Sequence, residues 1–232
     1  MPTQHRHASR HTAGTSTATT GHGKQRSVRS ALFATWYSAL MAAAEPVFLR
    51  PLRVTVLASA RGKLLFVGLG PGHDLRYLPS AVTSVTAVEP NPLMRRQARR
   101  RAVELGVELE LLDGVAESLP FPDNTFDTVV SPFVLCSIQD VPAALAEFKR
   151  VLRPDGELLV LEHVRATDGT LLGTAQDIAS RPWQICADGC HPNRRTREAL
   201  RAAGFNVELL ADGQLPIPVP VAPYLVGRAT VR

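Results

Sequence analysis

Cysteine is scarce in this sequence, which has three among 232 residues: Cys136, Cys186 and Cys190. A small, odd number argues against a disulfide scaffold and favours a reducing compartment, so we expect a cytoplasmic location. Cys186 and Cys190 are four residues apart, but no second pair of ligands follows at short spacing. Because a structural zinc site needs four ligands, the sequence predicts no metal centre.

The sequence also lacks an apolar run long enough to cross a membrane. The uncharged stretch 31–44 has fourteen residues, whereas a spanning helix needs about 20. We therefore expect no stable membrane span. The stretch has good helix formers and ends at Pro46, which predicts a helix packed on the domain, with an interfacial helix as the alternative.

Acidic residues are absent from residues 1–44, which carry five cations, while the remaining residues carry 21 cations and 21 anions. The basic balance thus belongs to the N-terminal arm, and the neutral body predicts no nucleic-acid partner. Residues 1–27 have no large apolar side chain beyond Met1, which predicts a disordered arm. An organelle transit peptide is the alternative for this arm.

From residue 62 onward, strand and helix patterns alternate. We expect strands at 64–68, 84–90, 107–112, 126–131 and 157–164, and helices at 91–105, 140–152 and 194–203. Two further strands, 205–210 and 224–231, are joined by a short proline-rich link, which predicts an antiparallel finish. In the helix 91–105, Met94, Ala98, Ala102 and Leu105 are expected to be buried, with five arginines facing solvent. The pattern predicts a doubly wound α/β sheet with helices on both faces.

The first strand ends in LLFVGLGPG, residues 64–72. Glycines after the first strand of such a sheet let a ligand approach the backbone closely. His73 stands where a dinucleotide loop has its last glycine, which disfavours a dehydrogenase. Glu89 ends the second strand, where a carboxylate can accept both hydroxyls of a ribose. The alternative for Glu89 is a cap on the helix that follows.

Four stretches between residues 62 and 164 resemble the motifs of class I S-adenosylmethionine-dependent methyltransferases: GLGPG, VEPNPLM, GVAESLPFPDNTFDTVVSPFVLC and LAEFKRVLRPDGELLVLEHV. The resemblance implies a Rossmann-like seven-stranded sheet whose last strand is antiparallel, with S-adenosylmethionine as cofactor. It divides the chain into an arm (1–27), a helical segment (28–61) and a methyltransferase domain (62–232) with a lid insertion at about 165–193. The implied cofactor residues are Gly68, Gly70, Gly72, Glu89, Pro90, Val115, Ala116, Glu117, Ser131 and Phe133.

Two positions depart from the family pattern. Phe66 stands where the family usually has an acid two residues before the first glycine, and Val115 where an aspartate is common. The first departure removes one polar anchor for the cofactor. It also favours a second reading of the chain, a module that binds the cofactor without turnover.

VLCSI, LEHV, Trp183, DGC and RRTRE together resemble the branch that methylates alkyl thiols, and its bacterial relatives. We therefore expect a small-molecule acceptor, with a thiol as first choice and O-, N- or C-methylation of a quinone, lipid or secondary metabolite as the alternative. His163 is the expected proton acceptor, with a packed strand-end residue as its alternative. The expected acceptor residues are Tyr37, Cys136, Trp183, Asp188 and Cys190. The oligomeric state is left open by the sequence.

Overall fold

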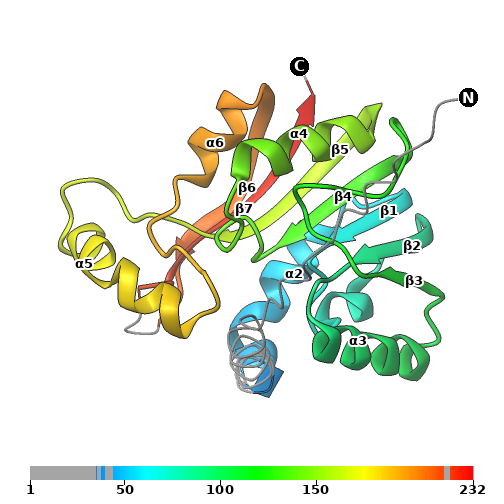
Figure 1. Cartoon of the computed structure of the whole chain (residues 1–232), viewed down its shortest axis with the longest axis horizontal. Helices are drawn as coiled ribbons and strands as arrows, with labels where there is room; N and C mark the ends of the chain where they lie inside the picture. The colour runs from blue at the N-terminus through cyan, green and yellow to red at the C-terminus, as the bar shows by residue number, and fades with distance from the viewer. Residues whose placement is uncertain (1–34, 36–37, 40–43, 217–219, 232) are drawn as a thin grey trace, which may run out of the picture.

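The computed structural model describes residues 35, 38–39, 44–216 and 220–231 (Figure 1). The predictions for the arm 1–27, for most of the helix at 30–45 and for Tyr37 lie outside the described residues. Within them, no helix has the length and apolar character that a membrane span requires.

Seven strands form one mixed sheet in the order β3-β2-β1-β4-β5-β7-β6. They are β1 (Gly62–Val67), β2 (Val82–Val88), β3 (Leu109–Leu112), β4 (Phe126–Pro132), β5 (Leu152–His163), β6 (Phe205–Gln214) and β7 (Pro223–Val231). Strands β1 to β5 pair in parallel, whereas β7 lies antiparallel between β5 and β6. This confirms the predicted seven-stranded sheet with an antiparallel last strand.

Helices cover both faces of the sheet, as predicted (Figure 1). On one face α4 (Val141–Val151) and α6 (Thr196–Ala202) pack over a core that includes Leu65, Val129 and Val160. On the other face α2 (Arg50–Leu57) and α3 (Pro92–Leu105) enclose a second core that includes Leu64, Phe66 and Leu159. Alternate residues of each buried strand therefore point into different cores.

Helix α3 follows its sequence signals closely. The Asn91 side chain accepts hydrogen bonds from the backbone of Leu93 and Met94, and Gly106 ends the helix in the left-handed region. Met94, Ala98 and Ala102 are buried as expected, but Leu105 is 39% exposed. The prediction for Leu105 was wrong: the residue lies in the last turn of the helix, directly before Gly106, and is not covered there.

The insertion after β5 contains α5 (Leu171–Cys186), which lies beside the body of the domain in Figure 1. The buried Gln176 ties this helix to three other segments. Its amide nitrogen donates to the carbonyls of Val164, Pro192 and Pro220, and its amide oxygen accepts from the backbone of Ala166. A π-helical turn (Glu45–Leu49) precedes α2, and a 3-10 turn (His73–Tyr77) follows the glycine loop.

Candidate functional site

The glycine loop follows the carboxyl end of β1, a strand that lies between β2 and β4. The order of the strands along the sheet reverses at this point, which is where ligands of such sheets bind. Gly70 has a φ of 60°, and a Cβ built on it would meet nothing within 4 Å. Gly72 has a φ of 80°, and a Cβ there would come within 3.1 Å of the α3 backbone at Ala98. The loop therefore offers open space at Gly70 and close packing at Gly72.

Glu89 lies beside this loop at the end of β2 and is 5% exposed. One carboxylate oxygen accepts from the Gly70 N–H at 2.8 Å and the other from the Asn91 N–H at 2.9 Å. Burial raises the pKa of Glu89, and the two backbone hydrogen bonds partly offset the shift. The carboxylate thus fixes the glycine loop and the start of α3, as the alternative of a helix cap predicted.

Residues after β3 form a second wall of this edge. Val115 is 47% exposed and pairs with Ser118 in a short bridge, while Ala116 is buried. Glu117 is partly buried, and Pro90 is exposed. An apolar surface of this kind beside Glu89 suits a flat adenine ring.

Phe66, at the position of the missing acid, is fully buried in the core on the α2 side of the sheet. A different acid lies close to the loop: Asp74 is 2% exposed, and one of its oxygens has no hydrogen-bond partner. Its other oxygen pairs with Arg53 at 2.5 Å, and Arg53 also pairs with Glu45 at 2.9 Å. The Arg53 guanidinium lies 5.8 Å from the centre of the Phe133 ring. Arg53 was not predicted from the sequence. The available signal was a cation among the apolar residues of α2 that face the core.

The turn after β4 is shaped by Glu162, a residue of β5 that the sequence analysis did not assign to the site. Its fully buried carboxylate accepts from the Ser131 hydroxyl and from the backbone N–H groups of Val134, Leu135 and Cys136, at 2.9 to 3.3 Å. Burial raises the pKa of Glu162 to about 7. A glutamate within the apolar run LLVLEHV was the available signal.

Phe133 lies in this turn with a φ of 59°, an unusual conformation for a large side chain. Its ring stacks on the His163 imidazole, with centroids 4.6 Å apart. Strain at such a residue persists only where the surroundings enforce it, and the Glu162 hydrogen bonds do so here. Phe133, an expected cofactor residue, is therefore in contact with the expected catalytic residue His163. Ser131 is linked to the same turn through its hydrogen bond to Glu162.

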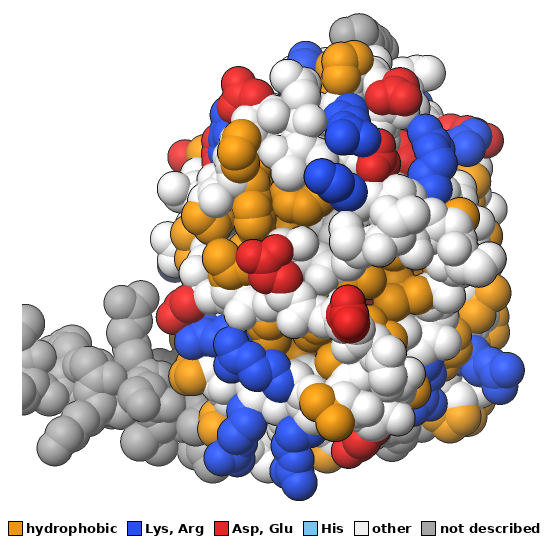
Figure 2. All heavy atoms as spheres, turned by 90° about the vertical axis from the view of Figure 1, so that its right-hand side faces the viewer, with side chains coloured by type: hydrophobic (Ala, Val, Ile, Leu, Met, Phe, Trp, Pro, Cys, Tyr) orange, Lys and Arg blue, Asp and Glu red, His pale blue; other side chains and the backbone are white. Residues whose placement is uncertain are grey.

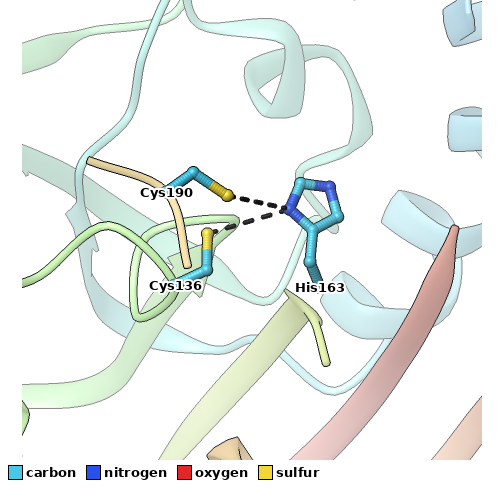
Figure 3. A group of neighbouring side chains, drawn as sticks. All are labelled: Cys136, His163 and Cys190. Carbon is cyan, nitrogen blue, oxygen red and sulfur yellow. Dashed lines mark hydrogen bonds between the residues drawn. The ribbon is translucent and has the colours of Figure 1, made fainter. Parts of the chain in front are cut away.

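His163 also meets two cysteines (Figure 3). Its Nδ1 lies 3.7 Å from Cys136 Sγ and 4.0 Å from Cys190 Sγ, and both thiols point toward this nitrogen. A hydrogen bond from Cys136, opposed by burial and helped by His163, lowers the pKa of Cys190. The same pairing and burial raise the pKa of Cys136. The three ligand atoms lie within 4.8 Å of one another, although the sequence predicted no metal centre.

The other expected acceptor residues do not all join this group. Trp183 packs against the cluster of Cys136 and Cys190. Asp188 is exposed with a φ of 47° and forms part of the turn before Cys190. Its side chain is not part of the group of Cys136, His163 and Cys190.

Three of the five α3 arginines do more than face solvent, contrary to the prediction. Arg95 donates to the carbonyl of Glu89, Arg99 to the carbonyl of Leu111 and Arg101 to the carbonyl of Pro71. Figure 2 shows basic side chains gathered on the lower part of one face, where α3 lies in Figure 1. Helix α3 therefore holds the loop after β2 and the glycine loop through hydrogen bonds to their carbonyls.

The fold and this edge together define a nucleoside-binding α/β domain of the methyltransferase type. A family model described as "Methyltransferase domain" matches residues 65–160. The chain is 32% identical to the human thiol S-methyltransferase TMT1B, covering 74% of this chain and 72% of that protein. It is 34% identical to the ubiquinone/menaquinone biosynthesis C-methyltransferase UbiE of Methylobacterium nodulans, covering 55% of this chain and 48% of that protein.

Among solved structures, the YcgJ protein of Bacillus subtilis superimposes with a TM-score of 0.66 at 19% identity, covering 78% of this chain and 97% of that chain. The chain belongs to the family of S-adenosylmethionine-dependent methyltransferases that includes the thiol S-methyltransferases TMT1A and TMT1B. It is therefore an enzyme that uses S-adenosylmethionine. The open space at Gly70 beside the Glu89 carboxylate leaves room for this cofactor at the end of β1.

Proposed function

We propose that this methyltransferase methylates the sulfur of a small thiol. One observation carries the proposal: the similarity to human TMT1B covers 74% of the chain, more than the matched methyltransferase domain at 65–160 accounts for. The name of that relative describes its own activity, thiol S-methylation. The chemistry of the side chains around His163 supports the same acceptor class.

The cofactor supplies a methyl group activated on a sulfonium sulfur. On the protein side, we assign the loop of Gly68, Gly70 and Gly72 to the amino acid part of the cofactor and Glu89 to the ribose. The adenine is assigned to the surface formed by Pro90, Val115, Ala116 and Glu117, and the methionine end to Ser131 and Phe133. Asp74, with its unpartnered buried oxygen, is placed to replace the acid lost at Phe66.

The acceptor is assigned to the side of Phe133 that carries His163. Cys136, Cys190 and Trp183 surround this histidine with sulfur and apolar surface. A thiol has a pKa of about 8.5, so a few per cent of it is already ionised at neutral pH. Removal of its proton therefore needs little assistance from the enzyme. His163 is the side chain placed to promote loss of the acceptor's proton. An alcohol would need stronger assistance.

The test uses purified full-length protein with methyl-labelled S-adenosylmethionine and a matched panel of alkyl thiols, phenols, amines and quinols. We expect labelled thioether from the thiols and little product from the rest. His163→Asn is expected to lower thiol turnover at least tenfold while leaving cofactor affinity nearly unchanged. Labelled phenol or amine products without thioether would refute the thiol assignment.

The similarity to UbiE favours a second candidate, C-methylation of a quinol ring. That similarity covers 55% of the chain, so it carries less weight for the acceptor half. Methylated quinol as the main labelled product of the panel would select this candidate. No labelled product from any acceptor of the panel, despite cofactor binding, would refute both candidates.

A further inference from the structure

The side chains of Cys136, His163 and Cys190 converge from three separate segments (Figure 3). Cys136 follows β4, His163 ends β5, and Cys190 follows α5. In a tetrahedral zinc site with Zn–S near 2.3 Å and Zn–N near 2.0 Å, neighbouring ligand atoms lie about 3.5 to 3.8 Å apart. The observed separations of 3.7 Å and 4.0 Å from His163 Nδ1 are close to these values.

The segments that carry the two cysteines are held in place independently of the thiols. Glu162 accepts from the backbone around Cys136. The loop of Cys190 is tied to the same turn, because the His191 N–H donates to the Cys136 carbonyl at 2.7 Å and Arg194 donates to the Ile138 carbonyl at 2.7 Å. The geometry of the three ligand atoms is therefore preorganised, which is what a metal site requires.

We propose that Cys136, His163 and Cys190 bind a soft divalent metal ion, with zinc the best match. Two thiolates and one neutral imidazole balance the charge of Zn²⁺, so the buried centre is electrically neutral. Within the part of the chain that the structure describes, no fourth His, Cys, Asp or Glu joins the group. Three protein ligands with an open position are typical of catalytic rather than structural zinc.

The open position gives the metal a role in the reaction, and this step rests on the proposed thiol methylation. The acceptor thiol would bind the metal at the open position, its S–H bond would break and the proton would pass to water. His163 would promote this loss as a ligand of the metal. The acceptor sulfur would then form a bond to the methyl carbon of S-adenosylmethionine while the bond from that carbon to the sulfonium sulfur breaks, which releases S-adenosylhomocysteine. The methylated product is a neutral thioether, a poor zinc ligand, and it would leave the metal.

The test measures metal binding directly, on full-length protein without an affinity tag. The four histidines at positions 5, 7, 11 and 22 are kept in every variant as a constant background. Elemental analysis should find zinc in the wild type and one fewer equivalent in Cys190→Ser, Cys136→Ser and His163→Asn. Cys186→Ser is the matched control, because Cys186 is an exposed free cysteine outside the group.

Cobalt(II) gives a second readout, because thiolate-to-cobalt charge-transfer absorption cannot come from histidines of the arm. We expect this band in the wild type and in Cys186→Ser, about half of it in Cys190→Ser, and full intensity but weaker affinity in His163→Asn. Circular dichroism and cofactor binding check folding. If the buried Cys136→Ser does not fold, Cys190→Ser and His163→Asn decide the question.

The absence of the band in the wild type, or an undiminished band and affinity in Cys190→Ser and His163→Asn, would overturn the metal site. So would thiol titration that reveals a disulfide between Cys136 and Cys190 in protein purified under reducing conditions. A metal-free wild type that still methylates thiols would refute this inference and leave the proposed function intact. Metal binding without thiol methylation would refute the proposed function and leave the site intact.

Discussion

Glu89 links the glycine loop to α3 through both carboxylate oxygens, so its removal affects the cofactor site in two ways. Glu89→Ala takes away the proposed ribose partner and leaves the N–H groups of Gly70 and Asn91 without their acceptor. Hydrogen bonds to charged groups contribute about 1.5–3 kcal/mol, so we expect affinity for S-adenosylmethionine to fall about 10- to 100-fold. Isothermal titration calorimetry measures this change.

The control for this prediction is Glu110→Ala. Glu110 lies on β3 and contacts the Thr86 hydroxyl at 3.3 Å, away from the glycine loop. Its removal should leave cofactor affinity within a factor of two. Equal affinities of the wild type and Glu89→Ala would contradict the ribose assignment.

His73, the residue that follows the glycine loop, predicts a pH dependence of stability. Burial, with the nearby Arg101, Arg53 and Arg76, lowers the pKa of His73 from 6.5 to about 3. The unfolded chain therefore takes up a proton below about pH 6.5 that the folded chain refuses, and stability falls as the pH drops toward 3. Between pH 6.5 and 4.5 this loss amounts to about 2 kcal/mol.

Urea unfolding of the wild type and of His73→Gln at several pH values tests this prediction. The variant should lose about 2 kcal/mol less than the wild type between pH 6.5 and 4.5. Above pH 7 the two proteins should show the same slope, because the imidazole is neutral in both states. Parallel curves over the whole range would show that His73 titrates normally when folded.

At the scale of elements, α5 is attached through polar side chains, of which Gln176 is the most buried, and through Trp183 near its end, whereas Leu171, Ile178 and Ile185 are exposed. Gln176→Leu removes the partners of three carbonyls and one N–H. Unsatisfied buried groups cost about 1–3 kcal/mol each, less where water enters, so we expect a loss of about 3 kcal/mol. Urea unfolding and faster hydrogen exchange in α5 would report it.

Ile178→Ala is the control on the same helix, because Ile178 is 76% exposed. This change should alter stability by about 0.5 kcal/mol or less. If Gln176→Leu were equally mild, the insertion would be free to move as a lid. The observed bonds favour a wall that stays attached during turnover.

Most elements could be predicted from the sequence because their signals are local. The caps Asn91 and Asp140, the break at Gly106 and the apolar strand runs each act within a few residues. Arg95 and Arg101 could not be predicted in the same way. Their partners are backbone carbonyls of two loops. Every residue has a carbonyl, so the pattern of side chains does not identify the one that accepts.

The whole molecule is expected to couple cofactor binding to stability, because the sheet edge that we propose for the cofactor borders both cores. A ligand present at 100 times its dissociation constant stabilises the folded state by about 2.7 kcal/mol. For a domain of this size we expect S-adenosylmethionine to raise the melting temperature by about 5–10 °C. Differential scanning fluorimetry measures the shift, with NAD as the control ligand. Equal shifts with both ligands, or none with either, would contradict the assignment of this edge.

The positions of the glycine loop after β1 and of Glu89 after β2 could be predicted from the sequence, because each follows a buried apolar strand directly. The cluster around His163 could not be found so directly. Cys136, His163 and Cys190 are brought together by the crossing from β4 to β5 and by the return of the chain after α5. Spacing along the chain offered only Cys186 and Cys190, of which Cys186 is not part of the group.

The single carboxylate of Glu162 has a consequence for attempts to change what this enzyme accepts. It fixes the turn that carries Phe133, which we assign to the donor, and Cys136, which we assign to the acceptor. Under this assignment, substitutions in the turn would disturb both halves of the reaction at once. Redesign of selectivity would have more freedom in the segment around Trp183, which contacts the cluster of Cys136 and Cys190 without taking part in those hydrogen bonds.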